Sequence, residues 1–214
     1  MLDTVIFSLL IGIFVGIASG YLGSIMVLEK MALVGDALSH VALPGLAIGI
    51  LFNFDPFIGA FIFLFASAAI IWHVQRVTRL SFEALVGTAF TLALAIGIII
   101  IPEPELLEAL FGEITKVTLI DAIAAAVISA VTILLTRAIY RKLVLAMISE
   151  DLAISKGIDV AKTNLLYLFL VSVVVAIGIK IVGTLLVGFL VIVPAIAAKN
   201  LSSDMLRYSL FSAV

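Results

Sequence analysis

A carboxylate and an imidazole lie four residues apart in an otherwise apolar stretch of this chain. They are Asp36 and His40, within the segment 35–45, GDALSHVALPG. On a helix this spacing puts both side chains on one face, one turn apart. Pro44 has no N–H, so we expect it to leave the carbonyl of His40 without its usual helical partner. A carboxylate, an imidazole and a carbonyl oxygen are ligands for a divalent cation.

The apolar surroundings make these two side chains costly. Ionisable groups at membrane depth need a partner, a cavity or a cargo. One interpretation is a structural polar pair that holds two helices together. The other is a path for a cation, with Asp36 and His40 as metal ligands, and the carbonyl freed by Pro44 favours this second interpretation.

The composition identifies the class of fold. Of the 214 residues, 64% are hydrophobic and 12% charged, whereas about a quarter of the residues of a soluble domain are charged. The apolar runs are continuous and not alternating, which predicts an all-α polytopic membrane protein rather than a barrel. The absence of cysteine excludes thiolate metal sites and disulfides. We expect one transmembrane domain over residues 1–214, surrounded by membrane lipid and without a nucleic-acid partner.

Catalytic signatures are missing from the chain. It has no phosphate-binding loop, no H-E-x-x-H motif and no G-x-S-x-G serine elbow. The sequence therefore predicts a transport subunit and not an enzyme. If transport is uphill, its energy must come from an ion gradient or from ATP hydrolysis on a separate chain.

Seven apolar segments predict about seven transmembrane helices. The last two are separated only around Gly178, Lys180 and Gly183. With the N-terminus outside the cytoplasm, all the basic residues except Lys116 and Lys180 fall on the cytoplasmic side, as the distribution of positive charge requires. The segments are 5–28, 37–52, 57–73, 84–101, 122–136, 164–179 and 181–198.

Four further features have two interpretations each. The acidic outer loop either concentrates cations near an entrance or is a solvated connection between two helices, and its stretch 105–111 is compatible with a short surface helix. Lys180 either snorkels to the outer interface or pairs with a carboxylate in a gate. Ser149 and Gly157 are a good start and stop for a cytoplasmic helix, which is either a docking element or a simple connector. Pro194 frees the carbonyl of Leu190, in a helix that lines a path or bends around its neighbours.

Four stretches together resemble the membrane permease of prokaryotic metal-ion ABC importers of the ABC-3 type, the zinc, manganese and iron permeases. They occur in the order of the family's motifs and cover most of residues 28–198. The stretches are LEKMALVGDALSH at 28–40, LFGEI at 110–114 with the later Asp121, EDLAISKGI at 150–158, and VGTLLVGFLVIVPA at 182–195.

The resemblance implies a type II ABC importer-like bundle in the prokaryotic cell (inner) membrane. It implies a homodimer, two cytoplasmic ATPase subunits and an extracytoplasmic metal-binding protein. Family members usually continue for at least another helix, so we expect this bundle to lack a C-terminal helix. The transported ion would be divalent zinc, manganese or iron, with no permanently bound cofactor, and the residue types do not choose among these metals.

The resemblance also assigns roles to single residues. Asp36 and His40 match positions expected to line the ion path, near the dimer axis. Glu113 and Lys180 become a candidate outer gate, and Pro44 and Pro194 mark expected helix kinks. The cytoplasmic coupling segment spans about 143–162, and its expected ATPase contacts are Glu150, Asp151, Ala153 and Gly157.

Three other functions remain open from the residues alone. A secondary cation/proton transporter would use Asp36 and His40 as a proton relay and would need no ATPase. A permease for metal chelates would need a wider path. A scaffold that transports nothing would use the polar pair for stability only, so that substitution of both residues would lower stability and not flux.

Overall fold

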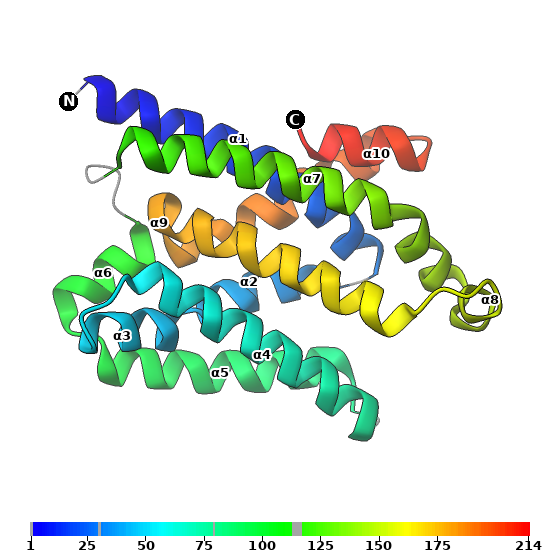
Figure 1. Cartoon of the computed structure of the whole chain (residues 1–214), viewed down its shortest axis with the longest axis horizontal. Helices are drawn as coiled ribbons and strands as arrows, with labels where there is room; N and C mark the ends of the chain where they lie inside the picture. The colour runs from blue at the N-terminus through cyan, green and yellow to red at the C-terminus, as the bar shows by residue number, and fades with distance from the viewer. Residues whose placement is uncertain (1, 30, 79, 113–116) are drawn as a thin grey trace.

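The computed structural model describes residues 2–29, 31–78, 80–112 and 117–214, and every regular element within them is an α-helix. The helices lie side by side in one bundle (Figure 1). In chain order they are α1 (Leu2–Leu28), α2 (Ala32–Val41), α3 (Leu43–Leu51), α4 (Pro56–Thr78), α5 (Phe82–Ile100), α6 (Glu103–Phe111), α7 (Leu119–Ile148), α8 (Glu150–Ser155), α9 (Val160–Leu201) and α10 (Met205–Ser212).

Within the described residues, six helical stretches are long and apolar enough to cross a membrane, and one of them is long enough to cross twice. α9 has 42 residues, a length of about 63 Å at 1.5 Å per residue, about twice the hydrocarbon thickness of a bilayer. Its helical geometry is interrupted at Gly183, where φ is 77° and ψ is 168°. Residues on the two sides of Gly183 lie side by side, since a Cβ on Gly178 would lie 2.9 Å from Val187 Cγ2. The chain therefore folds back at Gly183. The six stretches therefore give seven crossings, which confirms the expected number.

α9 is the centre of the bundle. It packs against α1, α2, α4, α6, α7 and α10, and its buried residues include Val171, Val175 and Ile179. The hydroxyl of buried Tyr167 donates to the backbone carbonyl of Leu22 at 2.9 Å and ties α9 to α1. This hydrogen bond satisfies the polar end of the buried Tyr167 side chain.

Small residues bring the second half of α9 close to α1 and α2. A Cβ on Gly23 of α1 would meet the backbone carbonyl of Val191, and a Cβ on Gly35 of α2 would lie 3.3 Å from Val191 Cγ1. Close approach of backbones at glycine is typical of helix packing in membranes, where apolar burial drives association weakly. These contacts fix the position of α2, which carries the candidate site.

The polar elements gather at the two ends of the bundle. α6, the start of α7 and the N-terminus lie at one end, and α8 lies with the start of α9 at the other (Figure 1). The predicted short helices are confirmed as α6 and α8. Ser149 caps α8, since its hydroxyl accepts from the backbone N–H of Leu152 at 3.2 Å, as the sequence predicted.

Candidate functional site

Asp36 and His40 lie on α2, one turn apart, in the span that is buried to the greatest extent in the bundle. His40 is 7% exposed, and Asp36 is partly buried. The hydroxyl of Ser39 donates to the backbone carbonyl of Asp36 at 2.7 Å. The two predicted ligands are therefore together, at membrane depth, on a helix held by its neighbours.

Gly188 is the residue of α9 that makes room for Asp36. A Cβ placed on Gly188 would lie 2.6 Å from Asp36 Cα and 2.7 Å from its Oδ1. Any side chain at position 188 would thus displace the carboxylate or the backbone of α2. Gly188 could not be singled out from the sequence, because the contact joins residues 152 positions apart and leaves no local pattern.

The ring of His40 packs edge-on against Phe90 of α5, with centroids 5.4 Å apart. Its Nδ1 is buried and has no hydrogen-bond partner. The backbone at Ala42, between α2 and α3, stays helical, with φ −70° and ψ −22°. Pro44 has no N–H to donate to the carbonyl of His40, and the use of this carbonyl as a ligand stays a prediction.

One protomer offers few ligands. Within the described residues, no group of three or more His, Cys, Asp or Glu side chains gathers closely enough to hold a metal ion. Divalent transition metals in proteins usually take four or more ligands. Asp36 and His40 alone would leave a coordination shell incomplete.

At the end of the bundle that carries α6, two glycines join α6 to the interruption in α9. Gly112 follows α6 with φ 75° and ψ 173°, and Gly183 has nearly the same dihedral angles. This region of backbone space is almost restricted to glycine. A Cβ on Gly112 would lie 2.7 Å from Gly183 N, and a Cβ on Gly183 would lie 2.5 Å from Gly112 N. Each glycine thus requires the other, and α6 is fixed to the point where α9 reverses.

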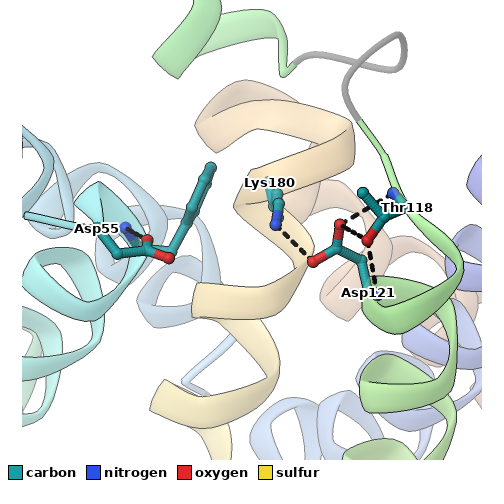
Figure 2. A network of polar contacts seen from close by, with 5 residues as sticks. Asp55, Thr118, Asp121 and Lys180 are labelled. Atoms are coloured by element: carbon teal, nitrogen blue, oxygen red, sulfur yellow. Dashed lines mark hydrogen bonds and ion pairs between the residues drawn. The ribbon is translucent and has the colours of Figure 1, made fainter.

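Lys180 pairs with Asp121, the residue at the start of α7, at 2.6 Å (Figure 2). Thr118 caps the same helix and shares a reciprocal capping box with Asp121. The Lys180 ammonium also lies 5.4 Å from the centre of the Phe57 ring. The pairing of Lys180 with a carboxylate is therefore present, and it links α9, α7 and α4. The other residue of the candidate outer gate, Glu113, lies outside the described residues.

Breaking this ion pair is expected to lower stability. Because both side chains are less than one-third exposed, Lys180→Met should cost about 1–3 kcal/mol by leaving Asp121 without its counter-ion. The matched control is Lys162→Met, since Lys162 forms an exposed pair with Asp159 that should contribute less than about 1 kcal/mol. Thermal unfolding in detergent measures both. Equal shifts in Tm for the two variants would contradict the structural role of Lys180.

The opposite end of the bundle, around α8, contains the second group of predicted site residues. Glu150 and Asp151 are exposed on α8, whereas Ala153 is fully buried beneath them. Gly157 has a φ of 76° and reverses the chain before α9. A cavity of about 570 Å³ opens beside α8, and Glu29 and Glu150 both line it. One side of α8 is thus buried against the bundle, and the other side is exposed.

Burial in that cavity raises the pKa of Glu29 from 4.5 to about 7. A raised pKa in the folded state means that the folded protein binds more protons than the unfolded chain between these values. Stability should therefore fall by about 3 kcal/mol as the pH rises from 4.5 to 7. Glu29→Gln should flatten this part of the profile of Tm against pH in detergent. A profile identical to that of the parent would show that Glu29 is solvated.

The architecture and the site define a class. The features described above are typical of a polytopic membrane transport protein. They are seven apolar crossings, an acid–imidazole pair inside one of them, and polar helices at both ends of the bundle. A family comparison agrees over the whole chain: residues 1–214 match the ABC 3 transport family. The chain belongs to this family and is a membrane permease subunit of an ABC transporter, which confirms the predicted class and the prediction of a non-enzymatic subunit.

The match to curated relatives covers most of the length of each relative. The chain is 32% identical to the high-affinity zinc uptake system membrane protein ZnuB of Buchnera aphidicola, over 100% of this chain and 84% of the relative. It is 31% identical to the manganese transport system membrane protein MntC of Listeria monocytogenes, over 97% and 77%. Among solved structures, PsaBC from Streptococcus pneumoniae in complex with Fab superposes with a TM-score of 0.83 at 30% identity, over 96% and 76%.

Proposed function

We propose that this permease imports a divalent transition-metal ion, Zn²⁺, Mn²⁺ or Fe²⁺, along a path that passes Asp36 and His40. The observation that carries the proposal is a partly buried carboxylate and a buried imidazole on one face of α2, with no side chain at Gly188 opposite Asp36. Relatives named for zinc and for manganese support the class of ion. Both metals accept imidazole and carboxylate ligands.

A homodimer would complete the coordination shell. α5 is the least buried of the six candidate spans, and it packs directly against α2. Its exposed residues include Gly87, Thr88 and Thr91, and a Cβ on Gly87 would meet nothing within 4 Å. Small residues of this kind suit close packing of helices in a membrane. We infer that α5 faces a second copy, which brings the two acid–imidazole pairs toward a common axis.

The ends of the bundle suit the two other partners. α8, with exposed Glu150 and Asp151 above buried Ala153, suits contact with a cytoplasmic ATPase subunit. α6, joined to α9 through Gly112 and Gly183, suits contact with an extracytoplasmic metal-binding protein. An N-terminus on the extracytoplasmic side of a prokaryotic cell (inner) membrane is part of this proposal, and it is supported by the position of the start of α1 at the same end as α6 (Figure 1).

Reconstitution tests the proposed energy source. The permease is placed in vesicles with its ATPase, and the metal-binding protein is supplied at the extracytoplasmic face. Uptake of radiolabelled Mn²⁺ or Zn²⁺ should require ATP and should persist when an uncoupler removes the proton gradient. Uptake that collapses with the uncoupler and needs no ATPase would contradict the proposal and favour a cation/proton exchanger. Uptake of a chelated metal but not of the free ion would favour a chelate permease.

A further inference from the structure

Thr184 carries a buried hydroxyl with no hydrogen-bond partner. Its side chain is 0% exposed, and Oγ1 has no donor or acceptor within reach. Elsewhere in the bundle, helical Ser and Thr hydroxyls bond to the carbonyl one turn back, as Ser172 does to Leu168 and Thr163 to Asp159. Thr184 directly follows the interruption at Gly183. Its helix has no preceding turn to supply that carbonyl, which explains the unpartnered oxygen.

The register of two helices brings Thr184 to the level of His40. α2 and the second half of α9 run antiparallel, since Gly35 lies by Val191 and Asp36 by Gly188. His40 lies one turn after Asp36 on α2, and Thr184 lies one turn before Gly188 on α9. Each is about 6 Å along its helix axis from the contact between Asp36 and Gly188. Both also lie on the faces that make this contact.

Two unpartnered polar atoms therefore lie at about the same level of the bundle. They are the Nδ1 of His40 and the Oγ1 of Thr184, both inside the membrane-spanning core. A buried polar group without a partner is unfavourable unless something else supplies the missing bond. A cation that passes Asp36 and His40, with the water it still carries, supplies such a bond.

We propose that Thr184 is a third polar group of the cation site, whose hydroxyl oxygen contacts the divalent ion or a water bound to it beside His40. This inference rests on the proposed function of Asp36 and His40. It gives the interruption at Gly183 a second consequence: besides reversing the chain, it leaves the hydroxyl of the next residue free for the cargo.

The test compares variants of equal shape. Thr184→Val removes the hydroxyl and keeps the branched side chain, while Thr184→Ser keeps the hydroxyl. The matched control is Thr136→Val, because Thr136 of α7 is also fully buried with an unpartnered Oγ1. Each variant is reconstituted with the ATPase and the metal-binding protein. The readouts are the KM for Mn²⁺ or Zn²⁺ uptake and, for the detergent-solubilised permease, the Kd for the same ion and the Tm.

Thr184→Val is expected to raise the KM and the Kd about tenfold, the equivalent of one hydrogen bond, with an unchanged or higher Tm. Thr184→Ser and Thr136→Val should behave as the parent. If Thr184→Val keeps the parental KM and Kd, the hydroxyl is not part of the site. If Thr184→Val fails to fold, Thr184→Ala is measured in the same way and decides by the same criteria.

A parallel measurement on Asp36→Ala with His40→Ala separates the two proposals. If that double variant loses uptake while Thr184→Val keeps the parental KM and Kd, the inference about Thr184 fails and the proposed function stands. If the double variant also transports as the parent does, the site itself is wrongly placed.

Discussion

Gly188→Ala is expected to lower metal uptake at least tenfold. The added Cβ would lie 2.6 Å from Asp36 Cα and 2.7 Å from Oδ1, closer than atoms of neighbouring helices approach. Either α2 moves away from α9 or the carboxylate swings out of the site. A displacement of about 1 Å in a ligand is enough to lose productive geometry at a binding site. Uptake by reconstituted vesicles measures the effect.

The matched control for this variant is Gly12→Ala. Gly12 of α1 is also a helical glycine, but a Cβ at this position would have no neighbouring atom within 4 Å. By helix propensity alone, each of the two glycine-to-alanine substitutions should stabilise the folded protein by up to about 1 kcal/mol. A loss of uptake in both variants would mean that the loss does not come from displacement of Asp36.

Gly183→Ala is expected to be the most destabilising single substitution at the end of the bundle that carries α6. Its dihedral angles fall in a region almost restricted to glycine, which alone costs about 1–3 kcal/mol for another residue. The Cβ would in addition meet the backbone of α6 at the carbonyl of Leu110 and at Gly112 N. Together these should cost about 3 kcal/mol or more, seen as a lower Tm in detergent and a lower yield of folded protein.

Gly157→Ala separates the two causes. Gly157 has a φ of 76°, and a Cβ there would meet nothing within 4 Å. This control should therefore suffer backbone strain without a clash and lose less stability than Gly183→Ala. Equal losses would show that the contact between α6 and α9 contributes nothing, and that strain alone explains the requirement for glycine.

Local patterns predicted most of the helices. Continuous apolar runs indicate membrane spans, Ser149 and Gly157 bound α8, and the weak separation around Gly183 indicated where the last two crossings divide. These features depend on residues near each other in the chain, so one sequence suffices to see them. The pairing of Asp36 with His40 on one face follows in the same way from their spacing.

Long-range contacts were not predictable. The packing of Gly188 against Asp36 and of Gly112 against Gly183 joins distant segments, and a glycine inside an apolar run gives no sign of what it faces. The hydroxyl of Thr184 has no local sign, because its isolation depends on the fold of α9.

The most direct test of the account is uptake of radiolabelled Mn²⁺ and Zn²⁺ by vesicles that contain the ATPase, the metal-binding protein and the variant Asp36→Ala with His40→Ala. The matched control is Asp55→Ala with His73→Ala, a carboxylate and an imidazole that are both exposed. We expect ATP-dependent uptake to be lost in the first variant and retained in the control, with the first variant still folded in detergent. Parental uptake by the first variant would contradict the cation path through α2. If the first variant yields less folded protein, but each folded molecule still transports as the parent does, Asp36 and His40 are a structural pair and not a transport site.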